Sequence, residues 1–354
     1  MPVPDPVLLR DHTTLRLGGP GREWVRATTE DELVAAVSEA DAVGTPVLVL
    51  GGGSNLVVAD QGFAGRVVEV ATTGMTTDAD DSGDPTCSGA TVTVAAGAGW
   101  DDLVAEAVTR GWVGVEALSG IPGSVGATPI QNVGAYGQEV SQTIARVRVW
   151  DRKLNGVRSF AASECQFGYR SSRFKADPGR HVVLAVTFQL RQGALGTPVR
   201  YAELARTLGV AEGQRAPLAD VRAAVLDLRR GKGMVLDAAD HDTWSAGSFF
   251  TNPFLTPDQA AALPADAPRW EQPDGTVKSS AGWLIEHAGF GKGWTSAAAG
   301  ERVSLSTKHA LALTNRGGAT TDELLTLARE VRDGVESRFG VRLVNEPVTV
   351  GCSL

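Results

Sequence analysis

Cysteine is scarce in this chain, with only three among 354 residues, at Cys87, Cys165 and Cys352. They stand far apart, with no Cys-x-x-Cys spacing and no cluster of cysteine and histidine. This spacing argues against a disulfide framework, a structural zinc site and an iron–sulfur centre, so we expect no metal at the functional site. It also favours a reducing compartment and therefore a cytoplasmic location.

Basic runs and long apolar segments are missing as well. The formal net charge is -8, and no stretch of Lys and Arg could follow a phosphate backbone, which disfavours nucleic-acid binding. No segment approaches the roughly 18 apolar residues of a membrane span, and the first residues do not resemble a secretory signal. We expect a monomer without nucleic-acid or membrane partners, which could still bind an anionic small molecule through local arginines and helix N-termini.

The length of the chain is too great for one ordinary core and predicts two or three domains. Hydrophobic periodicity predicts helices over 30–43, 100–110, 202–208, 218–230, 259–263, 281–288 and 321–339. Strands are predicted at 47–50, 56–58, 66–70, 91–95, 144–151, 156–161, 181–190, 341–344 and 348–350. The polar stretch 75–88 is predicted to be an exposed loop.

Two glycine-rich segments stand out in the first half of the chain. Residues 51–55, Gly-Gly-Gly-Ser-Asn, follow a predicted strand, so their N–H groups could form a nest for a phosphate. They match neither the dinucleotide fingerprint nor the Walker A pattern. Residues 114–137 are rich in glycine and nearly without charge, which is unusual for a solvated loop.

A pair of such loops suits a long ligand with a pyrophosphate and a flat ring system. Backbone amides would lie along the phosphates, small residues would lie against the ring, and Asn132 would stand at its polar edge. Flavin adenine dinucleotide fits this description best. The alternative is a pair of tight connections that bind no ligand.

The segment 246–253 places Ser248 between a glycine and two phenylalanines. Because Phe249 and Phe250 favour burial and glycine lets backbone approach closely, we expect the hydroxyl to be held at the wall of a pocket. Alternatively, it only satisfies a buried carbonyl group.

Two further segments carry charged side chains in unusual surroundings. Residues 167–175 interleave aromatics with cations, which suits a carboxylate or phosphate bound by Arg170, although a solvated basic turn is an equal alternative. Glu346 lies between apolar stretches, where partial burial would favour acid catalysis. The alternative for Glu346 is a glutamate on an edge strand that pairs with an arginine.

Taken in order, these segments resemble the UDP-N-acetylenolpyruvoylglucosamine reductase family of peptidoglycan synthesis. The resemblance extends over nearly the whole chain and rests on residues 13–19, 50–55, 120–126, 131–137, 169–175, 247–253, 280–286 and Glu346.

The resemblance implies an α+β fold, with a two-lobed FAD-binding module of the vanillyl-alcohol-oxidase (PCMH) type and a smaller α+β substrate-binding domain. Residues 1–72 would form the first FAD-binding lobe, joined by a C-terminal strand within 341–354. Residues 73–198 would form the second lobe, and residues 199–340 the substrate-binding domain.

The family's functional residues can be carried over by motif. The resemblance implies catalytic roles for Arg170, Ser248 and Glu346. It implies non-covalent FAD binding by Gly51, Gly52, Gly53, Ser54, Asn55, Gly120, Ile121, Pro122, Gly123, Ser124, Gly126, Asn132, Gly134 and Ala135. Substrate contacts would come from Tyr136, Tyr169, Tyr201, Lys232, Asn252 and Glu286, with Tyr201 closing over the UDP portion as in the family's first subtype.

The reaction implied is the reduction of UDP-N-acetylglucosamine enolpyruvate to UDP-N-acetylmuramate. NADPH would reduce FAD and leave, and the sugar would then bind in the same place. Hydride would pass from flavin N5 to the vinyl carbon distant from the carboxylate, and Ser248 would protonate the neighbouring carbon. Arg170 and Glu346 would stabilise the negative charge that develops.

Two local features depart from expectation. Pro347 directly follows Glu346, where a strand residue with an N–H group is expected. The stretch 234–244 contains several aspartates, which is acidic for the neighbourhood of a UDP site, and we expect it to bulge into solvent.

Two other functions stay open. A flavoprotein oxidase of the same module would commonly tether FAD through histidine or cysteine, yet neither residue occurs in the two glycine loops. A nucleotide-sugar sensor without enzymatic activity would keep the loops and would not need Ser248.

Overall fold

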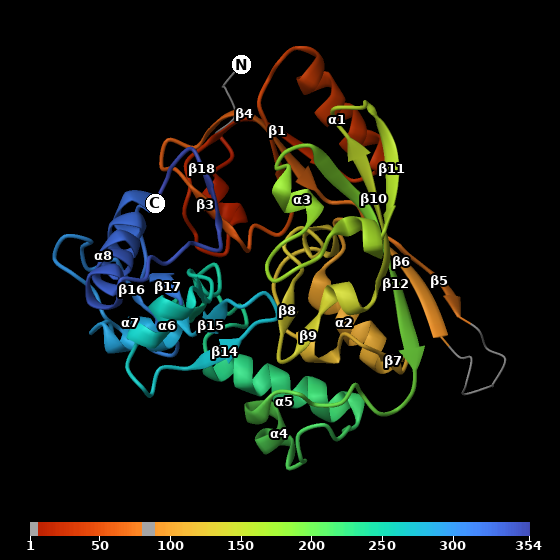
Figure 1. The fold of residues 1–354 in the computed structure, drawn as a ribbon. Coiled ribbons are helices and arrows are strands. Elements are labelled where there is room, and N and C mark those ends of the chain that lie inside the picture. The colour runs from red at the N-terminus through yellow and green to blue at the C-terminus, as the bar shows by residue number, and fades with distance from the viewer. Residues whose placement is uncertain (1–5, 80–88) are drawn as a thin grey trace. The chain divides into compact units, whose positions relative to one another are not determined.

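The computed structural model describes residues 6–79 and 89–354, which pack into two units (Figure 1). Unit 1 comprises Met1–Gly21, Gly53–Phe63 and Gly231–Leu354, and unit 2 comprises Arg22–Gly52 and Ala64–Arg230. The segment 199–340 is therefore shared between both units, since its part up to Arg230 packs within unit 2. The division into three functional domains stays a prediction.

Unit 2 is built on an antiparallel sheet in the order β11-β10-β12-β6-β5, with β7 paired to β12. Its strands are β5 (Met75–Ala79), β6 (Gly89–Ala95), β7 (Trp112–Val113), β10 (Ile144–Asp151), β11 (Gly156–Ala161) and β12 (His181–Gln192). Buried and half-buried residues alternate along β6, as a strand with one face in the core requires. That face packs with α2 (Trp100–Thr109), whose Trp100 is fully buried.

A smaller sheet in the order β1-β4-β2 consists of β1 (Gly21–Ala27), β4 (Phe63–Val70) and β2 (Val47–Leu50). The chain reaches β2 through α1 (Glu30–Ala42), which begins with a capping box between Thr29 and Glu32. This box satisfies N–H groups that the first turn of a helix leaves without partners. Leu33 and Val37 of α1 then pack with Ala27 of β1 in a core cluster of unit 2.

The remaining elements of unit 2 are short or lie after β12. They are η2 (Glu116–Leu118), η3 (Val125–Ala127), β8 (Gly134–Ala135), β9 (Gln138–Glu139), η4 (Val140–Gln142), η5 (Ala162–Cys165), α3 (Arg173–Ala176), α4 (Ala202–Leu208) and α5 (Leu218–Gly231), whose last residue belongs to unit 1. Leu204 of α4 and Val221 and Val225 of α5 form a separate cluster with Ala117.

Unit 1 is mainly helical around small sheets. Its elements are η1 (Leu9–His12), β3 (Leu56–Val58), η6 (His241–Thr243), β13 (Phe254–Leu255), α6 (Pro257–Ala262), β14 (Arg269–Glu271), β15 (Val277–Ser279), α7 (Ala281–His287), β16 (Val303–Leu305), β17 (Leu313–Asn315), α8 (Thr321–Phe339) and β18 (Val348–Val350). Strand β18 pairs in parallel with β3, far away in sequence.

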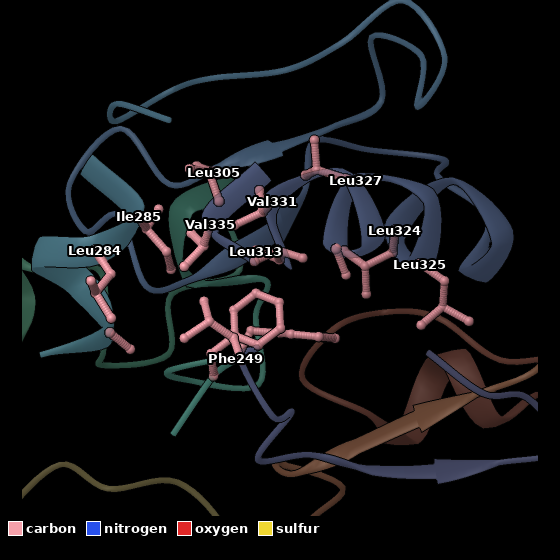
Figure 2. Packing of buried hydrophobic residues seen from close by; sticks show 14 of the residues in the cluster. Phe249, Leu284, Ile285, Leu305, Leu313, Leu324, Leu325, Leu327, Val331 and Val335 are labelled. Carbon is pink, nitrogen blue, oxygen red and sulfur yellow. The ribbon is translucent and has the colours of Figure 1, made fainter. Parts of the chain in front are cut away.

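The core of unit 1 gathers on α8. Figure 2 shows Leu324, Val331 and Val335 of this helix facing the same buried cluster as Phe249 and Leu284. These helix positions are spaced by seven and four residues, which places them on one side of the helix. Phe249 is 1% exposed, so this core holds the residue next to Ser248 in place.

The start of α8 fixes the short segment 53–63 within unit 1. Both carboxylate oxygens of Asp60 accept hydrogen bonds from the helix, Oδ1 from Thr321 N at 2.8 Å and Oδ2 from Asp322 N at 3.2 Å. The Thr321 hydroxyl donates to Val58 O at 2.6 Å. A carboxylate at a helix N-terminus also interacts favourably with the helix dipole, so this contact is favourable in two ways.

Most of the predicted elements are confirmed, with α4 and α8 matching their predicted bounds. Two assignments are wrong. Residues 75–79 form the edge strand β5, because their extended backbone pairs with β6, while 80–88 lie outside the described residues. Residues 341–344 are not a strand: their neighbour Asn345 makes only an isolated bridge with Phe250.

Of the helices in the described part of the chain, none has the length and apolar character that crossing a membrane requires.

The middle of α8 contains a glycine whose absent side chain makes room for an aromatic ring. A Cβ atom at Gly334 would stand 2.3 Å from Cζ of Phe290. We therefore expect Gly334→Ala to destabilise the protein by about 1–3 kcal/mol, although alanine is the better helix former. Ser337→Ala, at an exposed position of the same helix, should stay within about 0.5 kcal/mol. Urea unfolding of both variants measures this, and equal stabilities would contradict the close approach.

Candidate functional site

The two glycine-rich segments touch within unit 2. A Cβ atom at Gly52 would stand 2.6 Å from Cα of Gly123, and one at Gly51 would stand 2.6 Å from Oγ of Ser124. These separations are shorter than any ordinary contact between carbon atoms, so a side chain would push the loops apart. Glycine is therefore required at Gly52, where the loops meet backbone against backbone, whereas at Gly51 the close neighbour is a serine hydroxyl.

The second loop is held by hydrogen bonds to the residues just before α2 and in its first turn. Trp100 donates from its backbone to Gly123 O at 3.0 Å and from its indole to Leu118 O at 3.1 Å. Gly126 N donates to Ala96 O at 2.8 Å, and a Cβ atom there would stand 2.5 Å from Cβ of Ala96. The loop is thus a fixed part of the sheet-and-helix core.

Residues 120–123 have the geometry expected of a site for a phosphate or a flat ring. Gly120 and Gly123 adopt φ values of +71° and +117°, which other residues adopt only with strain. Ile121, Pro122 and Gly123 are half-buried, whereas Ser124 and Gly126 are buried. A rigid backbone without side chains at its close approaches can bring N–H groups to a pyrophosphate, so these residues fit FAD.

The last three residues of the first glycine turn belong to unit 1. Gly53 has φ +59° and a Cβ atom there would stand 1.9 Å from the His12 carbonyl oxygen, so glycine is again required. Asn55 accepts a hydrogen bond from Val348 N at 3.0 Å through its backbone carbonyl. Gly53, Ser54 and Asn55 are therefore anchored by β18 and by the segment around His12.

The side chain of Asn132 is buried and fully hydrogen-bonded within the loop region. Its side chain is 1% exposed, and its amide donates to Glu139 Oε2 at 2.8 Å and to Gly168 O at 3.1 Å. Its Oδ1 accepts from Ser141 N at 3.1 Å. The side chain thus ties the second glycine-rich segment to Gly168. Its predicted contact with FAD stays a prediction.

Arg170 lies against the hairpin of β8 and β9. Its NH2 group donates to Gly134 O at 3.1 Å, and its guanidinium stands 5.5 Å from the ring centre of Tyr169. Arg170 has φ +51°, and its carbonyl oxygen accepts from Lys175 Nζ at 3.0 Å. The structure therefore brings Arg170 next to Gly134, one of the predicted cofactor residues.

Two of the three tyrosines proposed as substrate contacts touch one another. Tyr136, at the turn of the β8–β9 hairpin, meets Tyr201 edge to face with 5.3 Å between ring centres. Tyr201 stands at the N-cap of α4 and is 43% exposed. Unit 2 thus gathers Arg170, Tyr136, Tyr169 and Tyr201 on or beside a single hairpin and the start of α4.

The backbone segments that carry Ser248 and Glu346 pair in unit 1. Glu346 N donates to Phe249 O at 2.8 Å, and Thr251 N donates to Val344 O at 3.0 Å. Phe250 and Asn345 form the bridge between these hydrogen bonds. The segment after Gly247 therefore runs antiparallel to the segment that carries Glu346, and both residues are half-buried.

Pro347 does not disturb this pairing, contrary to the concern raised by the sequence. Glu346 still pairs with Phe249, whereas Val348 already pairs with Asn55 O. The chain changes partners between these residues, so the N–H group that proline lacks is not needed. Asn345 Nδ2 donates to Pro347 O at 2.8 Å and closes the corner.

The other three proposed substrate residues lie at separate places in unit 1. Lys232 directly follows α5 and is half-buried. Asn252 accepts a hydrogen bond from Ala281 N at 3.0 Å through Oδ1, so it supports the first turn of α7. Glu286 is exposed on that helix. Their contacts with a substrate stay predictions.

The acidic stretch after Lys232 is only partly a solvent-exposed bulge. Residues 236–239 are exposed, but the expectation is wrong for Asp242, which is 4% exposed. The backbone and hydroxyl of Thr307 and the guanidinium of Arg316 donate to its carboxylate, the last at 2.7 Å. A Cβ atom at Gly233 would stand 3.0 Å from Asp242 O, so Asp242 supports the turn after Lys232.

Two further acidic residues near the glycine loop were not assigned a role from the sequence. Glu116 is 1% exposed and accepts from Gly114 N, Gln138 Nε2 and both donors of Thr197. Asp101 accepts from Gly120 N at 2.6 Å and from Arg222. A signal for both existed in the sequence, since carboxylates directly beside a glycine-rich loop often bind its N–H groups.

Over residues 6–79 and 89–354, no group of three or more His, Cys, Asp and Glu side chains could hold a metal ion. Burial raises the pKa of the Cys165 thiol to about 11. At neutral pH this thiol is therefore protonated and unreactive.

Two protein-family models match the chain. One is the C-terminal domain of UDP-N-acetylenolpyruvoylglucosamine reductase, over residues 239–350, and the other is an FAD-binding domain, over residues 23–155. The UDP-N-acetylenolpyruvoylglucosamine reductase of Cutibacterium acnes is 58% identical over 342 residues, covering 97% of this chain and 89% of that protein. The enzyme of the same name from Streptomyces avermitilis is 56% identical, with 97% and 93% coverage.

A solved structure is similar over the full length. The crystal structure of UDP-N-acetylenolpyruvylglucosamine reductase (MurB) from Thermus caldophilus superposes with a TM-score of 0.65 at 26% identity, covering 98% of both chains. Together with the matched FAD-binding domain, this likeness confirms the predicted fold class, an FAD-binding module of two lobes with a smaller α+β domain.

The contact between the two glycine loops can be tested by adding one methyl group. Gly52→Ala places a Cβ atom against the Gly123 backbone, which cannot rotate away, so we expect a loss of about 1–3 kcal/mol of stability. Gly156→Ala on β11 of the same unit serves as control, since the nearest atom to its new Cβ is 3.8 Å away. Urea unfolding and amide exchange at Gly123 measure the effect. Unchanged exchange in Gly52→Ala would contradict the contact.

Asp242 should make the stability of the protein depend on acid pH. Burial alone would raise the pKa of Asp242, but its hydrogen bonds from Thr307, Ser306 and Arg316 lower it below its ordinary value. A lowered pKa gives stability that is present above the unfolded-state pKa and is lost as pH falls through the folded-state pKa. At pH 7, Asp242→Asn should therefore cost about 1–3 kcal/mol, and this difference should shrink in acid.

Urea unfolding of Asp242→Asn at neutral and acid pH measures this dependence. Asp237→Asn, at an exposed position of the same stretch, is the matched control and should behave as wild type. A cost that stays constant down to acid pH would argue against an ionised Asp242.

Proposed function

Since the chain belongs to the UDP-N-acetylenolpyruvoylglucosamine reductase family, we propose that it reduces UDP-N-acetylglucosamine enolpyruvate to UDP-N-acetylmuramate with NADPH as the source of hydride. It is an FAD-dependent oxidoreductase of peptidoglycan precursor synthesis. FAD would be bound without a covalent bond. The rigid backbone of residues 51–52 and 120–126 in unit 2 would contact this cofactor.

One observation in particular supports the chemistry. Ser248 and Glu346, which are 98 positions apart, lie on adjacent extended segments that the Glu346 N to Phe249 O hydrogen bond of 2.8 Å joins. Phe249 and Phe250 are 1% exposed in the core of unit 1 and hold the segment of Ser248 in place. The backbone positions that carry the hydroxyl and the carboxyl group are thus held on adjacent segments.

In the proposed reaction, FAD held by the glycine loops would supply hydride for the vinyl carbon distant from the carboxylate. Ser248 donates the proton to the carbon next to the carboxylate, so that one hydride and one proton saturate the double bond. Water replaces the proton on Ser248 after the product leaves. Because a free serine is a weak acid, the rate gained from Ser248 depends on how its hydroxyl is oriented. The two buried phenylalanines that follow it hold its backbone in place.

Arg170 and Glu346 would stabilise the negative charge on the substrate carboxylate. The Arg170 guanidinium is positioned by Gly134 O and by the ring of Tyr169, and it would pair with the enolpyruvyl carboxylate as negative charge builds up there. Glu346 would share this role, as a hydrogen-bond donor when protonated.

Tyrosines and one lysine would bind the nucleotide part of the substrate. The edge-to-face pair of Tyr136 and Tyr201 supports a role in covering the UDP portion, as in the first subtype of the family. Lys232 would contact a phosphate, and Asn252 and Glu286 would contact the sugar nucleotide. We propose that the enzyme acts as a cytoplasmic monomer.

The two alternative functions make different predictions. An oxidase would consume oxygen and often keep its flavin after denaturation, whereas a reductase with non-covalent FAD would release it. A sensor would bind the nucleotide sugar and would not turn it over. Flavin release on denaturation, together with the anaerobic recovery of yellow colour when the enolpyruvyl sugar is added, separates all three.

Ser248→Ala tests the proposed proton donor. We expect reduction of FAD by NADPH to be unchanged, because this step needs no proton from Ser248. Reoxidation of the reduced flavin by the enolpyruvyl sugar should slow by roughly 10²–10⁴-fold. Rapid-mixing absorbance measurements under anaerobic conditions follow the two half-reactions separately.

Ser245→Ala is the matched control, since this serine lies in the same segment and its Oγ accepts a hydrogen bond from Gly247 N. It should leave both half-reactions near wild type. If reoxidation of Ser248→Ala were slowed by less than about tenfold, the assignment of the proton donor would have to be abandoned.

A further inference from the structure

Asp101 connects the second glycine loop to a helix that lies far along the chain. In the first turn of α2, its Oδ1 accepts from Gly120 N at 2.6 Å and from Arg222 NH1 at 2.7 Å. Its Oδ2 accepts from Arg222 NH2 at 2.9 Å. The guanidinium of Arg222, on α5, thus binds the carboxylate of Asp101 through two parallel hydrogen bonds, the strongest geometry for such an ion pair.

Gly120 lies between two points at which the loop is already fixed. The carbonyl groups of Leu118, before it, and of Gly123, after it, both accept hydrogen bonds from Trp100. Its φ of +71° sets the direction of the peptide groups on both sides. The bond to Asp101 therefore fixes how the middle of the loop presents its backbone.

The charge on Asp101 would by itself oppose an anionic cofactor. Burial would raise the pKa of Asp101, but hydrogen bonds from Arg222 and Gly120 and the charges of Arg222 and Arg229 lower it, so the carboxylate is ionised at neutral pH. A carboxylate in contact with a loop that binds a pyrophosphate repels it. Arg222 neutralises this charge and leaves the hydrogen bond to Gly120 in place.

Arg222 also belongs to the part of unit 2 that carries the proposed substrate tyrosine. Val221 and Val225, its neighbours on α5, pack with Leu204 and Ala205 of α4, whose N-cap is Tyr201. Tyr136 packs against the same cluster. The pair of Arg222 and Asp101 is therefore a polar link between this cluster and the glycine loop.

We infer that Asp101 and Arg222 are positioning residues for FAD: Asp101 orients Gly120, and Arg222 holds and neutralises Asp101. This inference rests on the proposed function only in that FAD is the cofactor of the loop. Neither side chain takes part in the reaction. Their removal weakens FAD binding through the loop, and the fold of unit 2 persists.

The affinity of the apoprotein for FAD, followed by flavin fluorescence without NADPH or sugar, tests this inference. Asp101→Ala and Arg222→Ala should each weaken FAD binding by roughly ten- to hundredfold, because each removes a hydrogen bond to a charged group. The double variant should be no weaker than Asp101→Ala, since Arg222 acts through Asp101. Arg222→Lys, which keeps the charge and loses the fork, should lie between wild type and Arg222→Ala.

Arg152→Ala is the matched control. Arg152 also binds an aspartate of the same unit, Asp41, through two hydrogen bonds, here from Nε and NH2, and its side chain is also 19% exposed. The side chain of Arg152 donates to Asp41 and to Gly179 O, and neither partner belongs to the glycine loops. This variant should bind FAD as wild type does, with a loss of thermal stability in the apoprotein similar to that of Arg222→Ala.

The outcomes separate this inference from the proposed function. Wild-type apoprotein that failed to bind FAD would overturn the proposed function itself. Wild-type binding with unchanged affinity in Arg222→Lys and in both alanine variants would overturn only the positioning role. Weakened binding in proportion to lost stability, with Arg152→Ala affected equally, would also overturn it. Should Asp101→Ala fail to fold, Arg222→Lys and Asp101→Asn still decide the question.

Discussion

The close approach of Gly52 to Gly123 is the constraint from which the proposed cofactor site follows. Any side chain at Gly52 would separate the two loops, and any side chain at Gly126 would push the second loop away from Ala96. Hydrogen bonds to Trp100 and Asp101 then hold this loop on the first turn of α2. Rigidity and the absence of side chains are both needed if backbone N–H groups are to bind a pyrophosphate.

The second constraint is the pairing of the segments that carry Ser248 and Glu346. The core of unit 1 buries the side chains of Phe249 and Phe250. The backbone of residues 249–251 is fixed by hydrogen bonds to residues 344–346. Pro347 is accommodated because it stands where the backbone pairing changes: Glu346 bonds to Phe249, and Val348 bonds to Asn55. A change of partner is one of the few places where a proline can follow a paired residue without leaving an unsatisfied carbonyl group.

Local signals in the sequence were sufficient for the longer helices, although the four-residue helix α3 was missed. The bounds of α4 and α8 follow from periodicity, and α8 has in addition the capping box of Thr320 and Glu323 and the left-handed Gly340. Local signals failed where a polar segment acquires partners from elsewhere. Residues 75–79 form a strand because they pair with the edge of β6. Asp242 can be buried because Arg316 neutralises its charge and Thr307 donates hydrogen bonds to it.

The sequence by itself determined the family, the fold class and the segments that matter, because glycine, proline and aromatic residues impose local conformations that depend little on distant neighbours. Only the tertiary structure decided which of these segments touch. It joined Glu346 to Phe249, buried the amide of Asn132, and linked Asp101 to Arg222 across 121 positions. Such contacts depend on how the sheets and helices pack, and no local pattern of residues encodes the packing of a partner more than a hundred positions away.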